Sequence, residues 1–238
     1  MKGFIILGLG MSSVLSAQID TAQVKEIQEV SFTKRLPVSK EIINVQKDLG
    51  ARNLGQDLPI LLKNQMSVVA TSDAGNGVGY TGFRIRGSAG TSINVMLNGV
   101  PYNDSESQGT FFVNIPDMAS SASQIVIQRG VGTSSNGTAS FGASVNILTK
   151  NPEEKPYFLT NQSAGSFNTV KHSFEAGTGK FLNNLLSVSA RYSIINSDGY
   201  IDRAFSKLNS YNINALFEKG NTKLRFLTFG GKEKTYQA

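Results

Sequence analysis

The chain has 238 residues, a formal net charge of +6 and 39% hydrophobic residues, which is enough for one ordinary domain and part of another. It has no cysteine and one histidine, His172, which excludes disulfides, thiolate zinc sites and most catalytic triads. The basic residues form no stripe with interleaved aromatics, so the composition argues against nucleic-acid binding. We expect no enzyme, no metal site and no cofactor.

The first residues indicate export. Lys2 supplies a positive charge, residues 4–15 form a short apolar run, and Ala17 offers a small residue at a cleavage point. The alternative is a membrane anchor, but the run is shorter than the ~20 apolar residues that a spanning helix needs. We predict a signal peptide over residues 1–17, which leaves a periplasmic, secreted or outer-membrane protein.

Residues 18–40 are polar except for residues 27–33, where apolar and polar side chains alternate as in a β-strand. A strand pattern in a polar tail is typical of an extended peptide that adds to the edge of another protein's sheet. An edge strand of its own domain and a plain linker are the alternatives.

Residues 41–152 have the pattern of a small α+β domain. A roughly helical apolar face spans residues 54–63, and Asn98-Gly99 is a strong turn signal, because both residues tolerate positive φ. The predicted strands cover residues 83–86, 93–97, 125–127 and 144–148.

Beyond Pro152 the pattern changes to long strands with one apolar and one polar face. Residues 185–194 alternate strictly and residues 210–217 less cleanly, with weaker candidates at 170–176 and 223–229. Segments of about ten such residues are typical of transmembrane β-strands. A soluble sandwich with one wet face would show the same alternation.

Three blocks in this order resemble the TonB-dependent receptors. Residues 29–35 resemble the TonB box, residues 83–87 with 95–101 resemble two blocks of the plug, and residues 125–150 resemble its closing signature. The amino-acid sequence of residues 128–134 resembles the corresponding segment of Bacteroidetes-type receptors. Two positions depart from the pattern. Asn98 stands where many members have Asp, and Val126 where many have Glu, so a carboxylate partner for a plug arginine is missing or comes from elsewhere.

The resemblance implies an α+β plug domain followed by antiparallel β-strands of an incomplete transmembrane β-barrel. The predicted parts are the signal peptide (1–17), the TonB box and linker (18–40), the plug (41–152) and the first barrel strands (153–238). Barrels of this type close with about 22 strands, so we expect the chain to be a fragment. The implied site residues are Glu29, Val30, Ser31, Phe32 and Thr33 for TonB, Arg84, Arg86 and Arg129 for plug–barrel contacts, and Tyr102, Asn103, Asp104, Ser105 and Glu106 for substrate.

The resemblance further implies energised import of a scarce ligand through the Gram-negative outer membrane, with a ferric siderophore as first choice. Cobalamin and glycan importers are alternatives, although glycan importers usually carry an extra β-domain for which residues 18–42 leave no room. The implied partners are TonB, the small ligand and outer-membrane lipid. A secreted or periplasmic β-rich binding module is the rival class.

Overall fold

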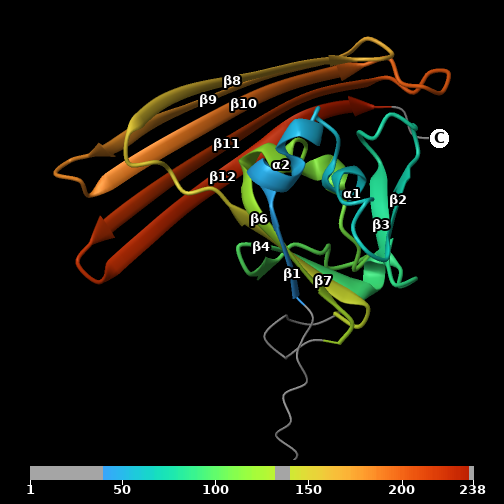
Figure 1. Ribbon diagram of the computed structural model, residues 1–238, viewed down its shortest axis with the longest axis horizontal. Helices are drawn as coiled ribbons and strands as arrows, with labels where there is room; N and C mark the ends of the chain where they lie inside the picture. The colour runs from blue at the N-terminus through green and yellow to red at the C-terminus, as the bar shows by residue number, and fades with distance from the viewer. Residues whose placement is uncertain (1–39, 132–139, 236–238) are drawn as a thin grey trace, which may run out of the picture. The chain divides into compact units, whose positions relative to one another are not determined.

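Three β-sheets organise the computed structural model, which describes residues 40–131 and 140–235 (Figure 1). The first sheet has the strand order β1-β6-β7-β4-β5, and the second is a hairpin of β2 and β3. Together with short helices these form the N-terminal domain, residues 40–152. Its strands are β1 (Lys40–Asn44), β2 (Val68–Ser72), β3 (Thr81–Ile85), β4 (Ile93–Leu97), β5 (Val100–Pro101), β6 (Ala122–Arg129) and β7 (Ala143–Thr149).

The helices of the N-terminal domain are all short. They are the π-helix Val45–Leu49, α1 (Leu58–Leu61), α2 (Met118–Ser121) and the 3-10 turns Gly50–Arg52, Gly90–Ser92 and Phe112–Asn114. The helix expected over residues 54–63 is therefore wrong in its extent. Gly55 has a φ of +110°, which breaks the helix before Leu58, and Pro59 follows at the first turn of α1. No helix among residues 40–131 and 140–235 is long and apolar enough to cross a membrane.

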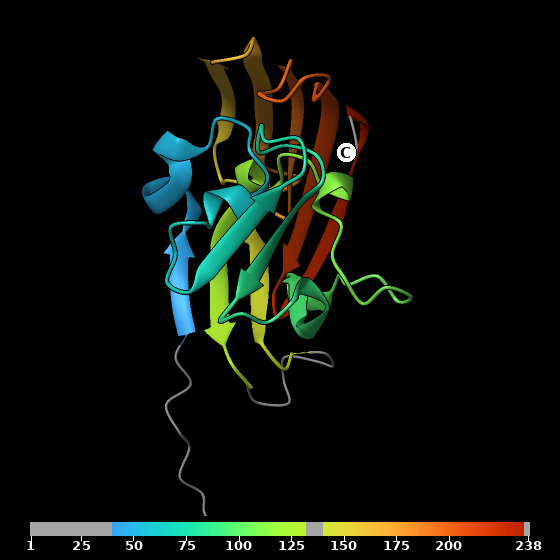
Figure 2. The same ribbon diagram turned by 90° about the vertical axis from the view of Figure 1, so that its right-hand side faces the viewer.

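The third sheet contains the five longest strands and is called the C-terminal sheet below. It consists of β8 (Pro156–Gly165), β9 (Thr169–Phe181), β10 (Leu186–Ser197), β11 (Ser206–Lys219) and β12 (Thr222–Thr235). Each strand pairs antiparallel with its neighbour in the chain, and Figure 2 shows them side by side from β8 in yellow to β12 in red. The sheet is open, since β8 and β12 form its two edges.

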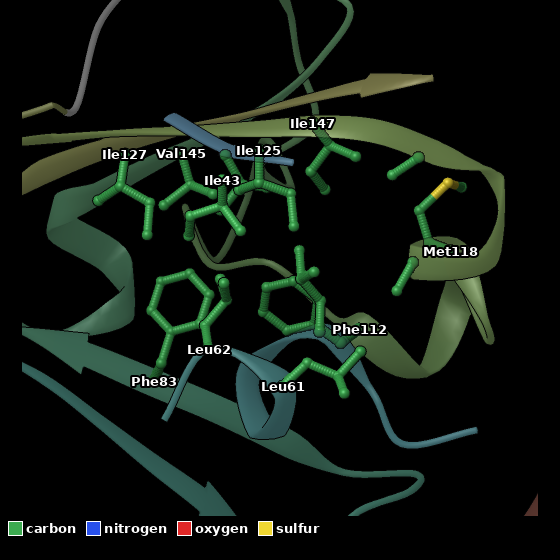
Figure 3. Packing of buried hydrophobic residues seen from close by; sticks show 14 of the residues in the cluster. Ile43, Leu61, Leu62, Phe83, Phe112, Met118, Ile125, Ile127, Val145 and Ile147 are labelled. Carbon is green, nitrogen blue, oxygen red and sulfur yellow. The ribbon is translucent and has the colours of Figure 1, made fainter. Parts of the chain in front are cut away.

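One apolar core holds the N-terminal domain together. Side chains from the β1-β6-β7 face meet those of α1, β3 and the turn at Phe112, as Figure 3 shows. The rings of Phe83 and Phe112 lie 5.3 Å apart at this junction. The ten labelled residues of the cluster are Ile43, Leu61, Leu62, Phe83, Phe112, Met118, Ile125, Ile127, Val145 and Ile147.

The expected fold class is confirmed, as an α+β domain followed by an open antiparallel sheet. All four strands predicted in the domain are present, and Asn98 and Gly99, with φ of 52° and 84°, form the predicted turn between β4 and β5. The expected strands after Pro152 are β9 to β12. Four strands, β1, β2, β5 and β8, were not predicted; β5 has only two residues and β8 has no clear alternation.

Candidate functional site

The two faces of the C-terminal sheet differ as the alternation predicted. On β10 the side chains of Ser187, Arg191 and Ser193 are buried, whereas Ala190 and Tyr192 between them are exposed. The same alternation continues on β11, where a buried row, polar except for Leu208 and Leu216, alternates with an exposed, largely apolar one. The polar face is therefore the one that packs on the N-terminal domain.

The centre of this contact is Asp117, the residue before α2. Its backbone has a φ of 51° and a ψ of 28°, a left-handed conformation that Asp tolerates better than most residues. This conformation leaves the carboxylate facing the C-terminal sheet, where it is completely buried. Its Oδ1 accepts a hydrogen bond of 2.8 Å from Lys171 Nζ, and its Oδ2 accepts one of 2.6 Å from Arg191 Nη1.

Hydroxyl groups complete the cluster around Asp117. Ser120 of α2 donates to Asp117 Oδ1 at 2.5 Å, and Ser193 of β10 donates to Asp117 Oδ2 at 2.6 Å. Lys171 Nζ also donates to Ser120 Oγ at 2.8 Å, and Arg191 Nε donates to Ser121 Oγ at 2.7 Å. We call Asp117, Lys171, Arg191, Ser120 and Ser193 the Asp117 cluster.

The electrostatics of the Asp117 cluster favour the charged form of Asp117 despite its burial. Burial by itself raises the pKa of Asp117, but the charges of Arg191 and Lys171 and the hydrogen bonds of Lys171 and Ser120 outweigh it, so that this pKa is lowered. Asp117 is therefore ionised at neutral pH. A buried ion pair of this kind adds little net stability, but loss of one partner leaves an uncompensated charge.

Two further contacts join the domain to the sheet. Near the loop between β10 and β11, Asn76 Nδ2 donates to Ala204 O and to Ser206 Oγ, both at 3.1 Å. Near the end of β7, Arg225 of β12 donates to Thr149 Oγ1 at 2.6 Å. Like the Asp117 cluster, these contacts are polar.

A cavity of about 240 Å³ with a mixed polar and apolar lining lies beside the Asp117 cluster, between the helices of the N-terminal domain and strands β8 to β10. Polar residues contribute much of its lining, among them Asn53, Ser120, Lys150, Asn161, Glu175 and Arg191. Since the cavity borders the Asp117 cluster, movement at the cluster would change its width.

The structure places Arg129 within the N-terminal domain. Its guanidinium pairs with the carboxylate of Glu41 on β1, and Arg129 Nε donates to Met66 O at 3.0 Å. The carboxylate absent at Val126 thus comes from the neighbouring strand, since Ile127 is the partner of Glu41 in the β1–β6 register. Arg84 and Arg86 are exposed, and within residues 40–131 and 140–235 neither makes a hydrogen bond or ion pair to β8–β12. A barrel contact for these three arginines stays a prediction.

The loop expected to bind substrate is held by its own side chains. Asn103 donates to Ile93 O at 2.9 Å and accepts from Val95 N at 2.7 Å, so its amide closes the loop onto β4. Asp104 accepts hydrogen bonds from Ser107, and Tyr102 packs against Phe229 with ring centroids 6.2 Å apart. Ser105 and Glu106 are exposed. The five residues thus form one ordered loop beside β12, and their role with substrate stays a prediction.

The predicted TonB-binding residues 29–33 lie outside the described residues, as do residues 132–139 of the closing signature. Sequence reasoning missed Asp117 and Lys171. The available signal was the polar face of residues 169–181, where Lys171, Ser173 and Glu175 alternate with Val170, His172 and Phe174. A buried lysine on such a face requires an acid opposite, but the sequence does not say which.

Comparison with known proteins agrees with this arrangement. The family model of the TonB-dependent receptor plug domain matches residues 33–144. No curated protein sequence matches the chain. Residues 33–144 therefore match the plug domain of the TonB-dependent receptors, and the N-terminal domain is called the plug below.

Solved structures of receptors share the fold. The pyoverdine outer-membrane receptor FpvA of Pseudomonas aeruginosa PAO1 matches with a TM-score of 0.66 and 15% identity, over 83% of this chain and 28% of FpvA. The ferric yersiniabactin uptake receptor FyuA of Yersinia pestis matches with a TM-score of 0.65 and 14% identity, over 84% of this chain and 32% of FyuA. The copper transporter OprC matches with a TM-score of 0.69 and 14% identity, over 84% of this chain and 32% of OprC. The chain thus spans about a third or less of the length of these receptors.

Proposed function

We propose that this protein takes part in energised import of a scarce ligand across the outer membrane, with TonB supplying the pull. The observation that carries the proposal is the Asp117 cluster, in which a plug carboxylate is held by two cations of the C-terminal sheet. A plug fixed by an apolar interface would resist removal over its whole area. The hydrogen bonds of the cluster instead break once donor and acceptor separate, and water that enters the gap raises the local dielectric constant and weakens the ion pairs.

The proposed coupling runs from the tail to this cluster. Residues 29–33 would pair with TonB as an added strand, and the pull would reach the plug through β1, which begins at Lys40 and pairs with β6. β6 in turn follows α2 and Asp117 directly in the chain. Force on β1 would thus pass to β6, which is connected through α2 to the Asp117 cluster. The cavity beside the cluster would then widen.

The C-terminal sheet supplies the wall in this proposal. Its plug side is polar, and its other side carries exposed apolar residues such as Phe158, Tyr192 and Phe226. This division suits a strand wall between a water-filled lumen and hydrocarbon. We infer export to the outer membrane of a Gram-negative cell, through the signal peptide of residues 1–17. A secreted binding module would leave the same apolar residues in water, and membrane fractionation separates the two cases.

The first choice of ligand is a ferric siderophore, supported by the similarity to FpvA, a pyoverdine receptor, and to FyuA, a ferric yersiniabactin uptake receptor. The test measures ligand uptake in cells that express the full-length gene product. Deletion of residues 27–33 is expected to abolish uptake of radiolabelled ferric siderophore while leaving its binding at the cell surface intact. Deletion of residues 20–26, equal in length and in the same tail, is the control and should leave both unchanged.

Two outcomes would contradict the proposal in different ways. Unchanged uptake after deletion of residues 27–33 would show that this segment is not the TonB box. Uptake of radiolabelled copper but not of ferric siderophores would leave the coupling intact and refute the choice of ligand.

A further inference from the structure

A cluster of three lysines lies on the face of the C-terminal sheet that points away from the plug. Lys207 of β11 is directly opposite Lys234 of β12, and Lys232 is opposite Asn209 one step farther along the same face. All three side chains are exposed. We call Lys207, Lys232 and Lys234 the lysine patch.

The lysine patch lacks an anionic partner within the described residues. None of its three ammonium groups takes part in an ion pair there, and the neighbour found for Lys234 is the ring of Phe205, at 5.9 Å from its Nζ. Glu233 stands between two of the lysines in the chain but points to the opposite face of β12, where its carboxylate oxygens are buried. Like charges directly opposite each other destabilise a strand pair, so this arrangement favours an external anion.

The same face continues from the lysine patch into an apolar belt. The next rows carry Phe174, Tyr192 and Tyr211, followed by Ala176, Ala190 and Ile213, with Phe226 beyond them. The first of these rows begins two residues from Asn209, about 7 Å along the strand. Phe174, Tyr192, Tyr211, Ile213 and Phe226 are all exposed. The lysine patch and the apolar belt together form one surface that is cationic at one end and apolar along the rest.

We propose that the lysine patch binds the phosphate of a lipid headgroup whose acyl chains lie along the apolar belt. The proposal rests on the proposed function, because it requires this face to border a membrane. Three neighbouring lysines supply more than enough positive charge to neutralise one phosphate, and a lipid phosphate is held at a fixed distance from its acyl chains. Free phosphate would satisfy the lysines but leave the belt uncovered, so the occupant is a lipid.

The test uses the whole chain in dodecyl maltoside micelles doped with equal amounts of dioleoyl phosphatidic acid and dioleoyl phosphatidylcholine. Native mass spectrometry then counts the lipids retained by the protein. The unmodified chain is expected to prefer phosphatidic acid by about 10-fold or more, since each basic residue near an anionic lipid surface adds to binding. K207Q/K232Q/K234Q is expected to lose that preference.

Two further variants make the result specific. K47Q/K63Q/K155Q removes the same charge at exposed positions outside the lysine patch, and it should keep the preference. K207R/K232R/K234R keeps the charge of the patch and should also keep it. If K207Q/K232Q/K234Q fails to fold, two other variants test the proposal. K207R/K232R/K234R should keep the preference for phosphatidic acid, and K232Q alone should lose it.

Each contrary result has its own meaning. Equal retention of both lipids by the unmodified chain would refute the binding of a lipid phosphate by the lysine patch. It would still agree with a sheet that borders the membrane. Displacement of phosphatidic acid by the same concentration of inorganic phosphate shows that the belt contributes nothing, which overturns the lipid assignment. If the protein retains neither lipid, the C-terminal sheet does not border a membrane, and the proposed function is refuted as well.

Discussion

Lys171 Nζ donates a hydrogen bond of 2.8 Å to Asp117 Oδ1, and the two side chains are 1% and 0% exposed. The acid belongs to the plug and the base to the C-terminal sheet. The family resemblance places cations, Arg84, Arg86 and Arg129, on the plug side of the contact, whereas here the plug supplies the acid. Since Arg191 adds a second cation on the sheet side, removal of the single carboxylate affects both.

Asp117→Asn is expected to weaken the contact between plug and sheet strongly. The amide keeps the shape of the side chain but leaves Lys171 and Arg191 buried without a counter-charge. Breaking a buried pair in this way costs about 3–5 kcal/mol. Urea denaturation of the chain followed by circular dichroism measures the loss in the free energy of unfolding.

The control for this substitution is Asp73→Asn, the same chemical change at an exposed plug position. It is expected to alter the free energy of unfolding by less than about 0.5 kcal/mol. If the two variants lost the same amount, the Asp117 cluster would not hold the domain to the sheet.

A double-mutant cycle tests whether Asp117 and Lys171 act as a pair. Lys171→Met alone leaves Asp117 with Arg191 as its one remaining cation, and Asp117→Asn alone leaves Lys171 buried without its carboxylate. The double variant should lose less than the sum of the two, with a coupling of about 1–3 kcal/mol. Additive losses would mean that the hydrogen bond contributes no pairwise energy.

Sequence patterns predicted β9 to β12 of the C-terminal sheet because these strands have one polar and one apolar face, whereas β8 lacks that alternation. Ser187, Ser189, Arg191 and Ser193 alternate with apolar residues, which identifies both the strand and its two sides. The hairpin turn at Asn98-Gly99 was predictable for a similar reason, since both residues accept positive φ. Local chemistry was sufficient in these cases.

The Asp117 cluster was not predictable because its members meet only through the tertiary fold. Asp117 is separated from Lys171 by 54 residues and from Arg191 by 74 residues in the chain. Nothing local distinguishes Asp117 from an ordinary residue before a helix. The same limit applies to Glu41 and Arg129, which are neighbours only because β1 pairs with β6.

Stability is expected to depend on pH through Asp57, a buried plug residue next to α1. Burial raises its pKa well above the ordinary value of 3.8, and the carboxylates of Glu233 and Asp117 raise it further, against hydrogen bonds from Thr81 and Gly79. Between the ordinary and the raised pKa, the folded chain binds a proton that the unfolded chain has lost. The contribution of Asp57 to the free energy of unfolding therefore falls as pH rises through this window.

Asp57→Asn should remove this fall, because the amide has no charge to bury and its oxygen can still accept from Thr81. The variant is expected to be more stable than the unmodified chain at neutral pH, by about 1.4 kcal/mol for each unit by which the pKa is raised. Denaturation curves recorded from pH 4 upward, roughly the ordinary carboxyl range, would show it. Parallel pH profiles for the two proteins would contradict the assignment.

Gly142, in the closing signature of the plug, is required by close packing. A Cβ built on Gly142 would lie 2.3 Å from Ser88 Cβ and 3.2 Å from Ser92 O, which real contacts do not allow. Ser88 cannot move freely, because its N–H donates to Ile85 O at 3.0 Å at the end of β3. Gly142→Ala must therefore shift the backbone around Ser88, at a cost of about 1–3 kcal/mol.

Gly109→Ala is the matched control for Gly142→Ala. Its added Cβ would have Ser107 Oγ as its nearest neighbour at 3.7 Å, an ordinary contact, and Gly109 is not among the glycines with positive φ. Thermal unfolding of the two variants should therefore separate a packing effect from a general effect of replacing glycine. An equal change in both variants would mean that the approach of Ser88 to Gly142 does not constrain this position. A loss in Gly142→Ala alone would tie the glycine of the signature to the packing of β7 on the turn after β3.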